Sequence, residues 1–293
     1  MRRRELPVRV RHETVQRLRD LRPENGCCTV SNVVEETSWP EKAATESTDS
    51  LPDGLQALRA QLSLAEVMRL IERTARWVHP DTFTYLPVWY PEHARGGLFY
   101  KANWTKAQMN QNRRTGVTNH KSEGNVHANK ALTLALGLRA AERPNWSCCH
   151  IWGVDDDRYQ AANAVVQDRR FFSCVANMVL LPTPLKAFTD VMIEVKMMLR
   201  VCVLHLHGFK CDHEAVANTM RDVAEWSKWD AYPESWPKPG HASLPAGTHA
   251  FSHRIKEAAD RRMASIRSDL KNAGPFYPRE EVRAVLDYWR IRL

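Results

Sequence analysis

WSCCHIWG (residues 146–153) and FFSCVANMVLLP (residues 171–182) are two apolar stretches separated by a polar loop that contains three consecutive aspartates. Both are rich in the aromatic, β-branched and other apolar residues that favour strands, and the loop favours a turn. We therefore predict a hairpin, with His150 at the end of its first strand and Asn177 on its second.

A helix is predicted directly after this hairpin. Pro182 and Pro184 end the second strand, and apolar residues from Val191 to Leu206 then recur at helical spacing until Gly208. Similar periodicity predicts further helices at about residues 55–79, 125–142, 212–229, 252–271 and 278–292. The expected fold class is α+β, a mainly helical protein with a strand, strand, helix unit at its centre.

Composition divides the chain into five regions. Residues 1–22 hold eight arginines against three acidic residues and predict a basic arm. Residues 23–50 are rich in Glu, Ser and Thr and predict an acidic, disordered linker. The folded part is expected to comprise a helical, basic region at residues 51–145, the hairpin-and-helix core at 146–210 and a helical C-terminal region at 211–293.

The balance of charge favours an anionic partner. The 293-residue chain has a formal net charge of +8, and nucleic acid is the commonest polyanion that a basic cytoplasmic protein meets. Charged residues interrupt the longest apolar segment, and the first residues lack the apolar core of a secretory signal. We therefore expect a cytoplasmic protein without a membrane span. Seven cysteines without a CxxC pair argue against a disulfide scaffold.

The central unit, with CHIW in its first stretch and NMVLLP in its second, resembles the HNH or ββα-metal endonuclease family over about residues 146–209. The resemblance implies a hairpin and a helix that hold one divalent ion, Mg²⁺ or Mn²⁺. It assigns His150 the role of the general base that deprotonates water, which suits a neutral imidazole at physiological pH. Asn177 matches the middle Asn of the family signature, which fixes the histidine through backbone hydrogen bonds and in some members binds the metal.

Two positions depart from the family pattern. Cys149 stands where the family often has a metal-binding Asp or His, and a thiol is a poor ligand for magnesium. Lys186 stands at the third signature position, nine residues after Asn177, and a protonated lysine cannot hold a metal. Asp190 lies four residues farther on, one helical turn along the same face, and we take it as the replacement oxygen ligand.

The cysteines and histidines of the chain make structural zinc an alternative cofactor. Cys148, Cys149 and Cys174, together with a histidine, are one candidate ligand set. A second group fits no common zinc spacing, and we expect buried cysteines and exposed histidines there: Cys202, His205, His207, Cys211 and His213.

Residues 101–143 are the most basic part of the folded region, with eight Lys or Arg against two acids. Residues 110–116, NQNRRTG, have side chains of the types that bind phosphates and base edges, although a polar surface turn is an equal alternative. The expected nucleic-acid contacts are Lys101, Lys106, Arg113, Arg114, Lys121 and Lys186.

Two functions follow from these observations. The first is a metal-dependent endonuclease that hydrolyses DNA, with RNA as the other substrate class, in restriction, defence or a mobile element. Cutting both strands would call for a homodimer. The alternative is a nuclease-like module that has lost its metal chemistry at Cys149 and Lys186 and now only binds nucleic acid. A toxin delivered to other cells is a third interpretation, for which the sequence shows no receptor-binding or translocation segment.

Overall fold

The computed structural model describes residues 53–153, 164–217, 223 and 229–293, which all belong to one unit spanning Trp39–Leu293. The predicted basic arm, the acidic linker and the aspartate-rich loop lie outside the described residues, as does most of the helix predicted at 212–229. The described part is α+β, about half helical, with small sheets of two strands each. Within it, no helix combines the length and the apolar character that a membrane span requires.

The elements of the described residues have the following bounds. The α-helices are α3 (Gly54–Arg59), α4 (Leu64–Thr74), α5 (Pro80–Tyr85), α6 (Val126–Ala135), α8 (Ala164–Gln167), α9 (Arg169–Phe172), α10 (Lys186–Val191), α11 (Ile193–His207), α13 (His253–Asn272) and α14 (Arg279–Tyr288). The strands are β1 (Trp77–Val78), β2 (Met109–Gln111), β3 (Thr118–His120), β4 (Trp146–His150), β5 (Met178–Pro182) and β6 (Thr248–His249). Short 3₁₀ helices are η1 (Ala102–Trp104), η2 (Ala140–Glu142), η3 (Val175–Asn177), η4 (Thr183–Leu185) and η5 (Glu214–Val216).

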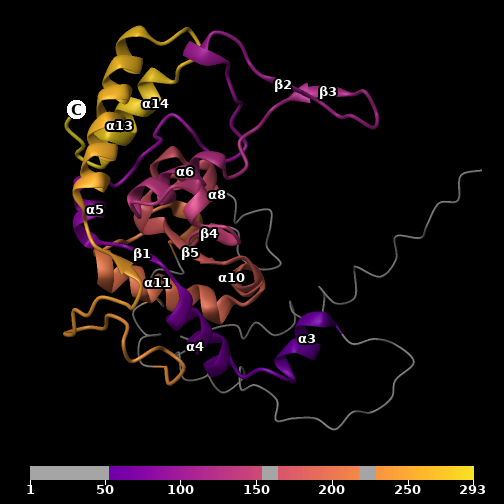
Figure 1. Cartoon of the computed structure of the whole chain (residues 1–293), viewed down its shortest axis with the longest axis vertical. Helices are drawn as coiled ribbons and strands as arrows, with labels where there is room; N and C mark the ends of the chain where they lie inside the picture. Colours follow the sequence, from indigo (N-terminus) through magenta and orange to yellow (C-terminus); the bar gives the residue numbers. More distant parts are fainter. Residues whose placement is uncertain (1–52, 154–163, 218–222, 224–228) are drawn as a thin grey trace, which may run out of the picture. The chain divides into compact units, whose positions relative to one another are not determined.

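The antiparallel pair β4 and β5 forms the centre of the fold (Figure 1). Its register pairs Cys148 with Leu180 and Cys149 with Val179, so that residues directly opposite each other share a face. Side chains on both faces are buried, which explains why β5 is a continuous apolar run and not an alternating one.

Each face of this pair packs on different helices. Cys149 and Val179 belong to a core cluster that includes apolar residues of α4 and α11. Cys148 and Leu180 belong to a second cluster that includes residues of α6 and α13. The regions expected at 51–145, 146–210 and 211–293 therefore share their hydrophobic cores.

The predicted strand over residues 171–177 is wrong, because β5 begins only at Met178. The preceding residues form α9 and η3, where the carboxylate of Asp168 accepts a hydrogen bond from the amide of Arg170 and caps α9. Phe171 and Phe172 are completely buried, so their apolar character reflects burial in the core and not strand structure.

The strand, strand, helix unit is found only in part, because α8, α9 and η3 lie between β4 and β5, so the two strands pair without forming a simple hairpin. The predicted helix divides into α10 and α11 at Met192, which has an extended backbone. The helix predicted over residues 125–142 ends at Ala135, before Gly137 with its positive φ of 69°. Helices α13 and α14 confirm the predictions at the C-terminal end, whereas residues 55–79 form two helices followed by β1.

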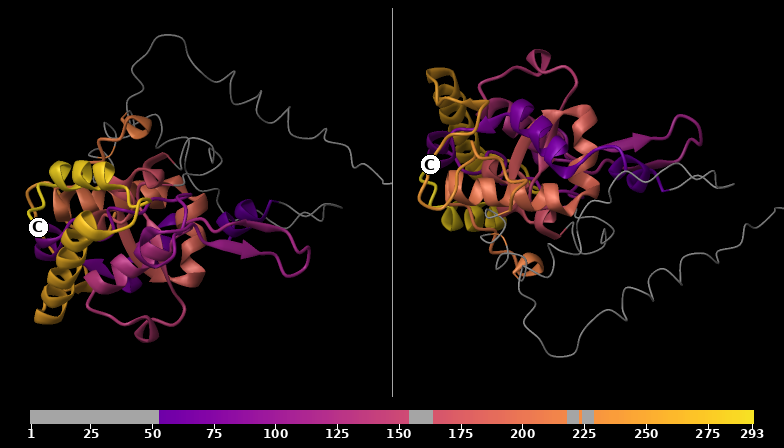
Figure 2. Two further views of the ribbon diagram at one scale, coloured as in Figure 1. Left: turned by 90° about the horizontal axis from the view of Figure 1, so that it is seen from above. Right: turned by 90° about the horizontal axis from the view of Figure 1, so that it is seen from below.

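The strands β2 and β3 form a separate hairpin with a fully exposed surface. In its turn, the side chain of Asn112 accepts hydrogen bonds from the amides of Arg114 and Thr115. Gly116 adopts the positive φ of 70° that closes the turn. Both views of Figure 2 show this hairpin extending away from the helices.

A substitution at Gly208 tests whether a left-handed residue is needed at the end of α11. Its φ of 64° is left-handed, and a Cβ at this position would meet no atom within 4 Å, so a Gly208→Ala substitution adds backbone strain without a clash. We expect a loss of about 1 kcal/mol in the free energy of unfolding, measured by urea denaturation. Gly54→Ala is the control, because Gly54 starts α3 without a positive φ and also has open space. Equal losses of unfolding free energy in both variants would show that the left-handed backbone of Gly208 has no special role at the end of α11.

Candidate functional site

His150, Lys186 and Asp190 line one cavity of about 250 Å³. The histidine ends β4, and the other two side chains come from α10. Arg95, Asn125, Cys148, Cys149 and Lys196 complete the lining. Three of the sequence-predicted residues thus lie together, and we call this cavity the His150 pocket.

A backbone carbonyl fixes the imidazole of His150. Its Nε2 lies 2.8 Å from the carbonyl oxygen of Phe172, and its ring stacks on the Phe172 ring with centroids 5.8 Å apart. Because a carbonyl oxygen only accepts hydrogen bonds, Nε2 carries the hydrogen, and in the neutral ring the lone pair lies on Nδ1. The ring therefore has one defined basic atom.

Burial keeps this imidazole neutral. It lowers the pKa of His150 from 6.5 to about 4, and the positive charges of Arg95, Lys196 and Lys186 act in the same direction. The hydrogen bond to the Phe172 carbonyl opposes these effects only in part. At physiological pH, His150 is an uncharged proton acceptor in a positively charged pocket.

Asn177 is completely buried, and the backbone occupies its amide. The Oδ1 atom accepts a hydrogen bond from the amide of Trp152 at 2.7 Å. The Nδ2 atom donates to the carbonyl oxygens of Trp152 and Phe171, at 2.9 and 3.1 Å. The backbone carbonyl of Asn177 also accepts from the amide of Ile151. Asn177 thus holds the residues after β4 and before β5 together, and it does not line the His150 pocket.

The donors of the His150 pocket suit an anion better than a hard cation. Asp190 is the only carboxylate among the pocket-lining residues, and its Oδ2 atom forms an ion pair with Lys186 one turn earlier on α10. Burial raises the pKa of Cys149 to about 11, so its sulfur is a protonated thiol. Arg95 and Lys196 add two positive charges that no sequence motif indicated.

The other predicted nucleic-acid contacts lie in and around the β2–β3 hairpin. Their side chains are exposed: Lys101, Lys106, Arg113, Arg114 and Lys121. Lys121 places its Nζ 4.6 Å from the centroid of the Phe99 ring. The structure therefore separates the six predicted residues, with Lys186 in the His150 pocket and five near the hairpin.

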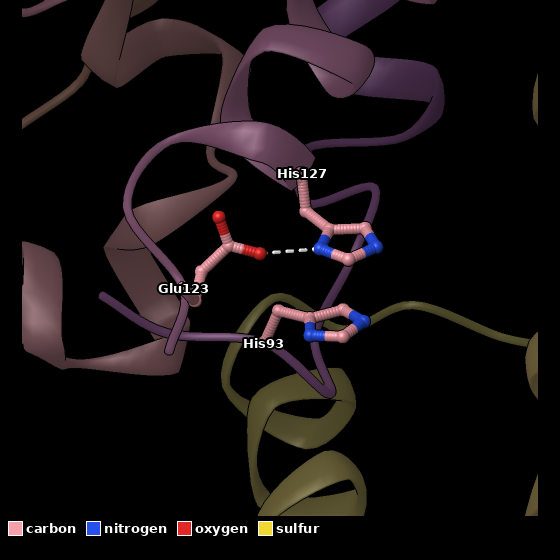
Figure 3. Close-up of side chains that lie close together, drawn as sticks. All are labelled: His93, Glu123 and His127. Carbon is pink, nitrogen blue, oxygen red and sulfur yellow. Dashed lines mark hydrogen bonds and ion pairs between the residues drawn. The ribbon is translucent and has the colours of Figure 1, made fainter. Parts of the chain in front are cut away.

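A second cluster joins His93, Glu123 and His127, and the sequence analysis did not single it out. One donor atom from each side chain lies within 4.8 Å of the others (Figure 3). Burial lowers the pKa of His93 to about 2, and His127 and nearby cations act in the same direction. Glu123 and His127 are four residues apart at the start of a predicted helix, so the sequence could have predicted that these two side chains lie close together. His93 had none, because it lies 30 residues before Glu123 in the chain.

The residues expected as zinc ligands do not form such a group. Within the described ranges, the His93, Glu123 and His127 cluster is the one set of three or more His, Cys, Asp or Glu side chains that brings its ligand atoms together. The thiols of Cys148, Cys149 and Cys174 are buried. In the other predicted group, Cys202 and Cys211 are buried as expected, but His205, His207 and His213 are half-buried and not exposed.

Comparison of the chain with protein-family models, with curated proteins and with solved structures gives no match. The functional argument therefore rests on the two side-chain groups described above.

The buried His150 makes stability depend on pH. Because its pKa is lower in the folded protein than in the unfolded chain, the unfolded chain binds more protons between about pH 6.5 and pH 4. The stability contributed by the neutral ring is complete above this range and is lost as the pH falls through it. For His150→Gln, which keeps an N–H donor for Phe172, we expect the wild type to lose about 3 kcal/mol relative to the variant.

Urea denaturation at several pH values measures this difference. His120→Gln is the control, because His120 is exposed in β3 and should follow the wild-type curve. Parallel curves for the wild type and His150→Gln would show that His150 is not held neutral in the folded state.

A substitution at Asn177 tests how much its hydrogen bonds between the residues after β4 and those before β5 stabilise the fold. In Asn177→Ala, the backbone groups of Trp152 and the Phe171 carbonyl lose their partner in a buried place. We expect a loss of about 3 kcal/mol in the free energy of unfolding. Asn110→Ala, at an exposed position in β2, should change stability by less than about 0.5 kcal/mol. A small loss for Asn177→Ala would mean that the connection is held elsewhere.

Proposed function

We propose that this protein hydrolyses phosphodiester bonds in nucleic acid, with His150 as the general base. The observation that carries the proposal is the fixed imidazole of His150 in the wall of a pocket that also contains Arg95, Lys186 and Lys196. A neutral base beside three cations is suited to a reaction in which water attacks an anionic phosphate.

The reaction requires one proton transfer at His150. A water molecule gives a proton to Nδ1 as its oxygen bonds to phosphorus, and the bond between phosphorus and the sugar oxygen breaks. The sugar oxygen leaves as an alkoxide and takes its proton from solvent water. The imidazolium that forms remains hydrogen-bonded to the Phe172 carbonyl, which favours the charged ring. The positive side chains stabilise the negative charge that develops on the phosphate oxygens.

The β2–β3 hairpin supports nucleic acid as the substrate class. Arg113 and Arg114 lie in its exposed turn, and Lys106 and Lys121 flank its strands. Extended basic hairpins bind the phosphate backbone without sequence preference, which supplies affinity but not catalysis. The hairpin and the pocket thus have complementary roles on one long substrate.

A divalent ion beside His150, as in the HNH family, does not fit the donors that are present. Mg²⁺ and Mn²⁺ need several oxygen ligands, and the pocket offers one carboxylate, which is paired with Lys186. Asn177 is occupied by the backbone and Cys149 is a protonated thiol. We therefore assign the charge stabilisation in this pocket to its cationic side chains.

The same observation favours a second candidate function, a binding module without catalysis. A pocket of three cations around a histidine binds a phosphate equally well when no water is activated. Cleavage separates the two functions, because both predict binding that weakens as salt increases.

The test uses supercoiled plasmid and, in parallel, RNA, with magnesium, manganese or EDTA. We expect nicking or cleavage by the full-length protein, and a rate at least about 100-fold lower for His150→Ala because the general base is lost. His253→Ala is the matched control, since this histidine is exposed at the start of α13 and lies neither in the hairpin nor in the lining of the His150 pocket, and its rate should stay at the wild-type level. Loss of cleavage both with EDTA and in Asp190→Asn would show that the reaction needs a metal ion bound by Asp190.

Binding is measured on the same proteins by fluorescence anisotropy with a labelled duplex over a range of salt. Replacing Arg113 and Arg114 with Ala should make the slope of log affinity against log salt shallower, by the equivalent of about two phosphate contacts. Arg267→Ala on α13 should leave this slope unchanged. If no substrate is cut under any condition while binding depends on salt, the hydrolase is rejected and the binding module takes its place.

A further inference from the structure

His93, Glu123 and His127 come together from two segments of the chain. His93 lies in the connection after α5, and Glu123 lies just before α6. His127 is in the first turn of α6, and its Nδ1 lies 2.5 Å from Oε2 of Glu123. Figure 3 shows a ring nitrogen of His93 below this contact, on the same side of the two rings. All three donor atoms thus lie close together.

Glu123 is a buried carboxylate, with only 1% of its side chain exposed. One oxygen accepts a hydrogen bond from the amide of Val126 at 2.6 Å, at the start of α6. The other faces His127. Burying a carboxylate is costly unless a positive charge compensates for it, and here the compensating charge is a proton on His127 or a bound cation.

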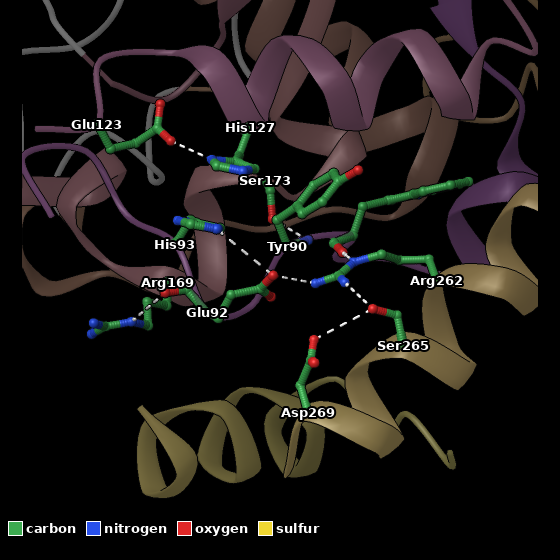
Figure 4. Close-up of polar contacts among 11 residues, drawn as sticks. Tyr90, Glu92, His93, Glu123, His127, Arg169, Ser173, Arg262, Ser265 and Asp269 are labelled. Carbon is green, nitrogen blue, oxygen red and sulfur yellow. Dashed lines mark hydrogen bonds and ion pairs between the residues drawn. The ribbon is translucent and has the colours of Figure 1, made fainter. Parts of the chain in front are cut away.

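The side chain of His93 faces a second buried carboxylate on its far side, beyond hydrogen-bond distance. Its Nε2 lies 3.7 Å from Oε1 of Glu92, which is also paired with Arg262 (Figure 4). Oε2 of Glu92 is buried and has no hydrogen-bond partner in the described part of the chain. A carboxylate behind the non-ligating nitrogen is the usual arrangement that orients a metal-binding histidine. It leaves Nδ1 of His93 for the side of Glu123.

From these contacts the geometry points to a binding site for a divalent transition-metal ion, with His93, Glu123 and His127 as its three protein ligands and Glu92 as the carboxylate that orients His93. Two imidazoles and one carboxylate are a ligand set for Zn²⁺ that leaves a fourth position for water. His93 and Glu92 also line a cavity of about 440 Å³, so the His93 side of the cluster borders an open cavity.

Binding changes the arrangement of the two rings. They stack in parallel, with centroids 3.4 Å apart and an angle of 8° between their planes. An ion must lie close to the plane of each ring that binds it, so the rings rotate away from parallel when they share one.

This metal site is independent of the hydrolase proposed above. The competing explanation is an ion pair between Glu123 and a protonated His127, which stabilises the start of α6 and binds no metal.

The experiment titrates Zn²⁺ into full-length protein that has first been dialysed against a chelator, with a chromogenic zinc indicator as competitor. We expect one tight site per chain. His93→Gln, His127→Gln and Glu123→Gln should abolish it, and Glu92→Gln should weaken it about 10- to 100-fold. His120→Gln, which changes an exposed histidine on the nearby hairpin, should bind zinc like the wild type.

Two further readouts keep the result clear if a variant folds poorly. Circular dichroism of each variant in EDTA shows whether it is folded, and Co²⁺ in place of Zn²⁺ should give the visible absorption of a tetrahedral site in the wild type. The site is supported if the wild type binds one Zn²⁺ per chain and the folded variants of His93, Glu123 and His127 do not. No tight binding by the wild type, or binding unchanged in all three ligand variants, overturns it in favour of the proton-held ion pair. Neither result depends on whether the protein cleaves nucleic acid.

Discussion

The side chain of Asn177 is the constraint on which the central unit depends. Its three hydrogen bonds reach Trp152, just after β4, and Phe171 in α9, and the side chain is completely buried. A primary amide carries two N–H donors and a carbonyl acceptor, so it satisfies carbonyl and N–H groups together. This connection also fixes Phe172, whose carbonyl oxygen sets the orientation of His150.

The two buried histidine groups differ in the charge that surrounds them. His150 lies among cations with one paired carboxylate, an environment that attracts phosphate and repels a metal ion. His93 and His127 lie against the carboxylates of Glu92 and Glu123, an environment that attracts a cation. The proton transfer that we propose in one place and the metal binding that we propose in the other differ because the neighbours of each histidine decide which charge is stabilised.

Several features of the fold were predictable because they depend on local periodicity. The helices α11, α13 and α14 and the strand β4 follow from the spacing of apolar residues and from the helix stop at Gly208. The strand predicted across Phe171 and Phe172 was wrong for a related reason. A short apolar run is compatible with a buried helix as well as a strand, and only the cap at Asp168 and the surrounding core decide between them.

The sequence by itself determined that two strands precede the helix ended by Gly208, that residues 101–143 are basic, and that His150 lies at the end of β4. It also indicated that Lys186 and Asp190 share a helix face, because residues four apart in a helix are neighbours. Only the tertiary structure brought Arg95 and Lys196 beside His150, and His93 beside Glu123 and His127. These contacts join segments far apart in the chain, and they are set by packing of both faces of the β4–β5 pair, which no local pattern of residues encodes.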